Sequence, residues 1–272
     1  MKTEHATFSI TTDLAGQNED MARVFPAFGA AGFSAVHWCQ DWTGQPVFYD
    51  HPFAARVGRL ARAHGLRVAD VHGFGGTGET GIPFTDELFA AIHVNRAEFA
   101  ARLGANVLVL HLPPRPHDDV DRALPDALAA IAALVPSCKA LGVRLAVENL
   151  VGPVHVPRFF DALLGEFPPD ELGFCYDSGH ALLAGQADLL ARYADRLIAT
   201  HLHDNDGTAD QHRLPGQGRC DWPTILAALD RPDYPGTVNL EVRLPEATDL
   251  ADFCKTAYRT LRERWDARRR LG

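Results

Sequence analysis

Residues 137–150 read SCKALGVRLAVENL, and the order of residue types in this segment indicates the fold. An Ala- and Leu-rich segment ends at Gly142, a residue type that terminates helices, and a short Val- and Leu-rich segment follows at once. The second segment ends on a carboxylate, Glu148. Helix, glycine, buried strand and polar strand end together form one repeat of a parallel α/β fold.

The same order recurs upstream and downstream, so that eight strands alternate with eight helices. The strands are predicted at residues 8–12, 33–38, 66–72, 106–111, 143–148, 172–177, 197–203 and 237–242. The helices are predicted at residues 20–31, 52–64, 86–103, 118–141, 156–167, 188–196 and 249–270, with one more opened by Asp221 and Pro223.

This alternation requires parallel strands joined by crossover helices. Eight units in 272 residues favour closure into a barrel, and no Gly-x-Gly-x-x-Gly follows the first strand, as an open dinucleotide-binding sheet would need. The predicted fold class is α/β, a single (β/α)8 TIM barrel whose one domain spans residues 1–272.

Composition limits the partners and the compartment. The formal net charge of −9 gives no support to nonspecific binding of nucleic acid or anionic membranes. The five cysteines are odd in number and form no Cys-x-x-Cys pair, which argues against a disulfide framework and a thiolate zinc knuckle. The N-terminus has no apolar signal core, and no run of about 18 or more apolar residues occurs. A cytoplasmic protein that neither spans nor binds a membrane is expected.

Metal-binding residue types stand at the end of one predicted strand after another. In a barrel these ends converge, so Glu148, Asp177, His201 and Glu241 are expected to share a metal although they are far apart in the sequence. Three carboxylates and one imidazole suit Mn²⁺, Co²⁺, Fe²⁺ or Zn²⁺. Without a cation, three buried carboxylates would repel one another.

Five motifs occur in an order typical of a known family. They are Glu-Asn at 148–149, Asp-Ser-Gly-His at 177–180, His-Leu-His-Asp-Asn-Asp at 201–206, DQHRLPGQGRCDW at 210–222 and Leu-Glu at 240–241. In these motifs the chain resembles the xylose isomerase-like TIM barrels, also called the AP endonuclease family 2 superfamily, which contains sugar isomerases, sugar epimerases and endonuclease IV.

The resemblance implies a divalent metal, with Zn²⁺ or Mn²⁺ expected and one to three ions bound. For an epimerase-like member it implies a single ion held by Glu148, Asp177, a histidine of the seventh strand and Glu241. For an endonuclease IV-like member it implies three zinc ions and further ligands. These further ligands are His72, His111, His180, Asp210 and His212.

Two parts of this ligand set are ambiguous in the sequence. His201 and His203 have the same parity on a strand, so both face inward and either could be the ligand. The His-x-x-Asp spacing favours His201, and His203 would then orient the site or contact substrate. Asp210 and His212 lie in a loop that Gly216 and Gly218 indicate to be tight.

Substrate contacts are expected from several side chains near the predicted barrel mouth. His37 and Trp38, at the end of the second strand, could stack on a sugar ring, or the tryptophan could cap the core. Arg115 and Arg213 could clamp a phosphate, or be solvated loop charges. His72 and His203 complete the substrate-binding candidates, whereas His93 and His155 are predicted to be packing or surface residues.

The preferred hypothesis is a divalent-metal-dependent isomerase or epimerase of a sugar or sugar-like small molecule. In it Glu148 and Glu241 exchange a proton on an enediolate-forming carbon, with His180 as a further catalytic candidate.

The alternative is an endonuclease IV-like multi-zinc phosphodiesterase. The early loops offer acids and glycines rather than the Arg and Lys that a DNA backbone requires, which favours a carbohydrate over a nucleic acid. A noncatalytic metal-stabilised binding protein is a third class, and the sequence leaves a homodimer open.

Overall fold

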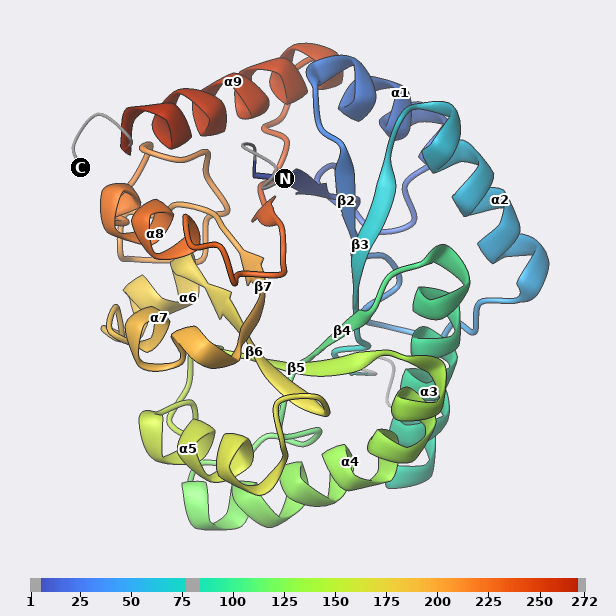
Figure 1. Ribbon diagram of the computed structural model, residues 1–272, viewed down its shortest axis with the longest axis vertical. Coiled ribbons are helices and arrows are strands. Elements are labelled where there is room, and N and C mark those ends of the chain that lie inside the picture. The colour runs from blue at the N-terminus through green and yellow to red at the C-terminus, as the bar shows by residue number, and fades with distance from the viewer. Residues whose placement is uncertain (1–5, 77–83, 269–272) are drawn as a thin grey trace.

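The computed structural model describes residues 6–76 and 84–268, in which eight parallel strands form a ring with helices around its outside (Figure 1). Each strand pairs with the next from β1 to β7, and β8 pairs with β1. The strands are β1 (Phe8–Thr11), β2 (Ala35–Trp38), β3 (Arg67–His72), β4 (Val107–Leu110), β5 (Arg144–Glu148), β6 (Leu172–Asp177), β7 (Leu197–His201) and β8 (Val238–Leu240). The predicted (β/α)8 TIM barrel is confirmed.

The ring closes at a narrow seam between β7 and β8. Just past the end of β7, Leu202 forms a parallel bridge with Leu240. The Leu202 amide donates to the Asn239 carbonyl at 2.9 Å, and the Glu241 amide donates to the Leu202 carbonyl at 3.0 Å. The seam therefore lies directly beside His201 and Glu241.

The helices begin and end where the sequence provides caps. Side chains of Asp20, Asp50, Thr85 and Asp119 accept backbone N–H groups at helix starts, which satisfies donors that have no partner within the helix. The helices are α1 (Met21–Ala31), α2 (His51–Ala63), α3 (Asp86–Leu103), α4 (Val120–Leu141), α5 (Pro157–Glu166), α6 (Ser178–Leu183), α7 (Leu189–Arg192), α8 (Trp222–Leu229) and α9 (Leu250–Arg268), with a 3-10 turn η2 (Ala194–Arg196).

The connection between β6 and β7 differs from the prediction. The single helix expected over residues 188–196 is replaced by α6, α7 and η2. Asp177 starts α6 by accepting the His180 amide at 2.7 Å, and Gly185, with φ of 65°, follows its end. A strand-end carboxylate thus also serves as a helix cap.

The interior of the ring is divided by polarity. Residues that share the inward parity of the strand ends form a separate small apolar cluster on the β4 to β7 side, which includes Val109, Ala146 and Cys175. On the β8 to β3 side the corresponding buried positions are polar, with Asp70 on β3 and Asn239 on β8.

One helix bears on the membrane expectation. By length and composition α4 could cross a membrane, with a mean hydropathy of 1.4 over its best window. Its buried residues recur at helical spacing from Ala123 to Cys138 and face the barrel, as in the core-facing helix of a globular domain. This helix is weak evidence for a membrane span.

Candidate metal centre

Acidic and imidazole side chains meet at the carboxyl ends of the strands. Glu148, Asp177 and His201 are the last residues of β5, β6 and β7, and all three are buried. Glu241 follows β8 directly. Since inward side chains at this end of a barrel point toward its axis, residues up to 93 positions apart lie in one site.

Five of these side chains form an inner cluster around Glu148. Its Oε2 lies 3.1 Å from Nδ1 of His201, and the same nitrogen lies 3.3 Å from Oε2 of Glu241. Nε2 of His111 and Nε2 of His72 approach this Glu148 oxygen at 3.3 and 3.7 Å. Two carboxylates and three imidazoles therefore surround one space.

Five more side chains form an outer cluster around Asp210. Nε2 of His212 lies 3.0 Å from its Oδ2, and Nε2 of His180 lies 3.6 Å from the same oxygen. Nε2 of His203 lies 3.1 Å from Oδ1 of Asp177 and 3.5 Å from Oδ1 of Asp210. The rings of His203 and His212 stack with centroids 4.0 Å apart.

His180 joins the two clusters. Its Nδ1 lies 3.4 Å from Oε1 of Glu148 and 3.6 Å from Oδ1 of Asp177. The preceding residue must be glycine, because a Cβ on Gly179 would lie 1.9 Å from Cε1 of His203. The four expected ligands Glu148, Asp177, His201 and Glu241 thus belong to one continuous network.

The structure gives His201 and His203 different surroundings. His201 faces the Glu148 and Glu241 carboxylates of the inner cluster, whereas His203 faces Asp177 and Asp210 of the outer cluster. Both face inward, as their parity predicts. Either can therefore supply a ligand, each to a different cluster.

The loop that carries Asp210 and His212 is tightly built. The Asp204 carboxylate accepts the amides of Gly216 and Cys220 at 2.7 and 3.0 Å, and also the Trp222 indole N–H. His212 itself adopts a left-handed backbone, with φ of 47°. These bonds hold the loop against the strand ends.

Several histidines are oriented as metal ligands are. Nδ1 of His72, His180 and His212 each contacts a backbone carbonyl oxygen, at 2.7, 3.0 and 2.7 Å respectively. With Nδ1 donating to a carbonyl, Nε2 is the atom that would bind an ion in place of a proton, which is the usual support of a metal-binding imidazole. Among the described residues, Glu148 Oε2 and both ring nitrogens of His201 have no hydrogen-bond partner. These oxygen and nitrogen donors fit a divalent ion.

The charges of the site are strongly coupled. Burial opposes ionisation of Glu148, but the imidazoles of His201 and His111 hold its pKa well below the ordinary value. Burial likewise opposes protonation of His212, yet its contact with Asp210 raises its pKa to about 9. Burial, reinforced by His111, lowers the pKa of His72. Without an ion, the carboxylates therefore depend on protonated histidines for their neutralisation.

Two of the predicted substrate contacts lie below or behind the mouth. Trp38 points out of the ring, where its ring packs against Phe99 and its indole N–H donates to the Tyr49 hydroxyl. His37 points inward, but it is fully buried and paired with Asp70. The placement of Trp38 matches the core-capping alternative, because strand neighbours face opposite sides.

The two predicted arginine clamps also lie outside the cluster. Arg115 is engaged by Asp86 and Asp126, and Arg213 by Asp206 at 3.1 Å. These carboxylates neutralise both guanidinium groups, so the solvated-charge alternative describes them better than a phosphate clamp.

Residues outside the predicted set of site residues also line the mouth. A cavity of about 90 Å³ opens over the inner cluster, and Asp13, Cys39, Trp42 and Arg243 contribute to its wall. Trp42 reaches it because its carbonyl accepts the Gly75 amide at 2.5 Å, which ties the loop after β2 to the loop after β3. The Trp at position 42 was visible in the sequence, but its fold over the mouth was not.

The fold and the site together define a TIM-barrel protein with a histidine- and carboxylate-rich centre at its strand ends. The chain belongs to the xylose isomerase-like TIM barrel family, whose model matches residues 26–262. This confirms the family expected from the five motifs.

Relatives of this chain include proteins of unassigned role and one named enzyme. The uncharacterized protein y4fM of Sinorhizobium fredii (strain NBRC 101917 / NGR234) is 31% identical over 243 residues, which cover 78% of this chain and 77% of the relative. The inosose dehydratase of Geobacillus kaustophilus (strain HTA426) is 32% identical over 124 residues, covering 38% of this chain and 40% of the relative.

Solved structures of similar fold include sugar epimerases. An L-ribulose 3-epimerase superposes with a TM-score of 0.74 at 18% identity, covering 98% of this chain and 97% of the epimerase. An AP endonuclease, family 2, from Brucella melitensis superposes with a TM-score of 0.70 at 15% identity, covering 91% and 96% of the two chains. At these identities the likeness shows the shared fold.

Proposed function

We propose that this protein is a divalent-metal-dependent isomerase or epimerase of a sugar or a sugar-like small molecule. The proposal rests on one observation: Oε2 of Glu148 and Oε2 of Glu241 both lie close to Nδ1 of His201, at 3.1 and 3.3 Å. Two carboxylates that face one space can remove a proton from one side of a carbon and return it from the other.

The ligands of this proposal are Glu148, Asp177, His201 and Glu241. A bound divalent ion would polarise the carbonyl and hydroxyl oxygens of a substrate, which acidifies the C–H between them and favours an enediolate. Glu148, whose pKa is held low by His201 and His111 despite burial, is ionised and ready to accept that proton at neutral pH.

His180 and Glu241 complete the proposed reaction. His180 lies at the cavity wall, and its pKa is well above the ordinary value because Asp177 opposes the effect of burial. It would donate a hydrogen bond to a substrate oxygen, while Glu241 returns a proton to the opposite face of the carbon. Sugar epimerases of the same fold and a relative named inosose dehydratase support a polyhydroxylated substrate.

The second candidate is a multi-zinc phosphodiesterase, which the outer cluster favours. His180, Asp210 and His212 supply donors for more than one ion, and Glu148 can bridge. Against it, Arg115 and Arg213 are neutralised by aspartates rather than directed toward a phosphate backbone.

The deciding experiment combines a metal count with isotope exchange. The metal-loaded protein is incubated in deuterated water with a panel of ketoses and ketose phosphates, and deuterium at carbon is measured by NMR. Exchange with at least one sugar, lost in Glu241→Gln and kept in the exposed control Glu166→Gln, is expected. Absence of exchange together with cleavage of abasic DNA by a protein carrying two or three zinc ions would instead establish the phosphodiesterase.

A further inference from the structure

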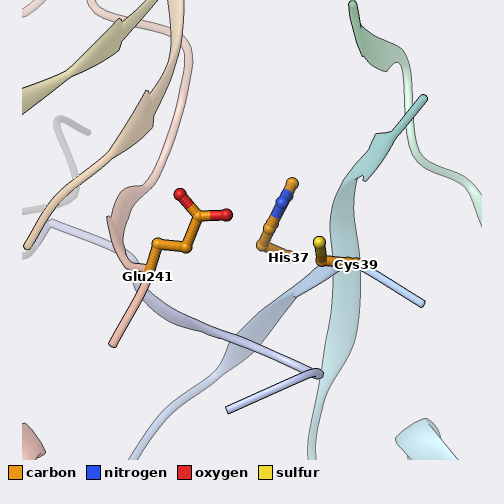
Figure 2. A group of neighbouring side chains, drawn as sticks. All are labelled: His37, Cys39 and Glu241. Atoms are coloured by element: carbon orange, nitrogen blue, oxygen red, sulfur yellow. The ribbon is translucent and has the colours of Figure 1, made fainter. Parts of the chain in front are cut away.

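On the β1, β2 and β8 side of the mouth, Glu241 of the proposed reaction lies among polar side chains that this reaction does not use. His37 lies on β2, Cys39 follows this strand, and Glu241 follows β8 (Figure 2). A ring nitrogen, the thiol sulfur and a carboxylate oxygen of these residues all lie within 4.8 Å of one another. This spacing is close to that of the ligands of one ion.

His37 carries the arrangement that supports a metal-binding histidine. Its ring is fully buried, and Nδ1 is paired with the Asp70 carboxylate on β3. Among residues 6–76 and 84–268, its Nε2 has no hydrogen-bond partner. A carboxylate fixes the tautomer of a ligating imidazole in this way, so that the other nitrogen presents its lone pair. A buried nitrogen without a partner is otherwise costly.

Hydrogen bonds with Thr12 hold the backbone of Cys39 in place. The Thr12 hydroxyl accepts the Cys39 amide at 2.9 Å and contacts the Cys39 carbonyl at 3.2 Å. These bonds fix the backbone that carries the buried thiol, which lies at the cavity wall together with Asp13 and Glu241.

Asp13 supplies a fourth oxygen donor on the same side. It lines the cavity together with Cys39, and the Thr11 hydroxyl donates to its Oδ1 at 2.5 Å. Its carboxylate therefore faces the same cavity as the Cys39 thiol and the Glu241 carboxylate.

We propose that His37 Nε2, Cys39 Sγ and a Glu241 oxygen bind a second divalent ion, with Asp13 as the fourth donor. Tetrahedral zinc needs donor separations of roughly 3.3–3.8 Å, so an ion would draw the three donors closer together than the 4.8 Å within which they lie. One sulfur donor selects Zn²⁺ or Cd²⁺ over Mg²⁺ and Mn²⁺. This site shares Glu241 with the inner cluster but does not require a sugar substrate.

Cobalt substitution tests the proposal, because Co²⁺ absorbs in the near ultraviolet when a thiolate binds it. Metal-free protein is titrated with Co²⁺, and the absorption and the number of bound ions are followed. The wild type is expected to show a thiolate-to-cobalt band. Cys39→Ser is expected to lose the band and one bound ion. Asp70→Asn is expected to lower the affinity for this ion by about 10–100-fold.

Two other cysteines serve as matched controls. Cys175 is also buried inside the ring and within ligand distance of Glu148 and His201, whereas Cys138 is buried on α4. Both Cys175→Ser and Cys138→Ser should keep the band. A band lost in Cys175→Ser but kept in Cys39→Ser would overturn the assignment.

A measurement on the unmutated protein protects the test from misfolded variants. X-ray absorption at the zinc edge should show one sulfur ligand on part of the bound zinc. A spectrum with oxygen and nitrogen ligands alone would overturn the proposal, whatever the result of the ketose exchange.

Discussion

His93 and His201 are both buried histidines, 1% and 0% exposed, yet their surroundings are opposite. His93 lies on α3 outside the ring, where Nδ1 donates to the Phe89 carbonyl at 2.7 Å and Nε2 accepts the Phe74 amide at 3.0 Å. His201 lies inside the ring beside two carboxylates, and neither of its nitrogens has a hydrogen-bond partner among the described residues.

The two pKa values follow from these partners. Burial lowers the pKa of His93 to about 4, since its neutral backbone partners do not offset the loss of solvent. For His201, Cys175 together with the Glu241 and Glu148 carboxylates overcomes the effect of burial and raises the pKa well above the ordinary value. Burial alone therefore does not identify a functional histidine. The groups around the imidazole identify it, because a neighbouring carboxylate favours the binding of a cation, either a proton or a metal ion.

Removal of Glu148, one of the two carboxylates that His201 faces, should have the greatest consequence. Glu148→Gln should lower the rate of substrate deuterium exchange about 10²–10⁴-fold, the range for loss of a general base. Exchange is measured by NMR on protein with equal metal content. The exposed Glu166→Gln should match the wild type, and a fully active Glu148→Gln would contradict the proposed base.

The pH dependence of the free energy of unfolding tests the other buried histidine, His93. The unfolded chain protonates His93 near pH 6.5, but the folded protein does not until about pH 4. The unfolded state thus binds more protons in this window, so stability falls as the pH falls through it, by about 3 kcal/mol.

Denaturant unfolding of metal-free protein between pH 7 and 4 measures this loss. His93→Gln should show a shallower decline than the wild type. An identical slope in both proteins would mean that His93 is not the neutral buried group described here.

Metal binding should raise the free energy of unfolding through the inner cluster and not through His93, which lies on α3 outside the ring. An ion at 100 times its dissociation constant raises the free energy of unfolding by about 2.7 kcal/mol, and chelation removes that gain. Thermal unfolding with and without Zn²⁺ or Mn²⁺ measures it. His93→Gln should keep the gain in stability and His201→Gln should lose most of it. The reverse pattern would contradict the assignment of His201 as a ligand and of His93 as a structural residue.

The smallest effect is expected at Arg115, which belongs to neither region. Arg115→Ala removes an exposed pair with Asp86 and a partly buried pair with Asp126, which keeps His117 as a partner, and should cost less than about 1 kcal/mol of stability. Steady-state kinetics should show an unchanged KM for ketose phosphates. A KM that rises for phosphorylated sugars alone would restore the phosphate clamp predicted from the sequence.

Much of this architecture could be predicted because it is periodic. The helix, glycine and strand order predicted the barrel, and the same parity predicted that His201 and His203 both face inward. Parity also places Trp38 opposite to His37, a signal that the proximity of Trp38 to the strand end obscured. Local pattern therefore sufficed wherever regular strands position the side chain.

The rest depends on contacts between distant loops. Trp42 reaches the mouth through Gly75, and Arg115 is neutralised by Asp86, 29 residues away in the sequence. Nothing in the local sequence of either residue encodes these partners. The separate roles of His201 and His203 likewise depend on which carboxylate each one meets.

The seam between β7 and β8 gives the site a mechanical role. His201 and Glu241 stand on the two sides of the joint that Leu202 and Leu240 close. An ion bound by both side chains would link the two strands at the seam, where, in the described part of the chain, a single bridge joins their backbones. Amide hydrogen exchange at Leu202 and Glu241 would then slow on metal loading, because the bound ion would hold the two sides of the seam together.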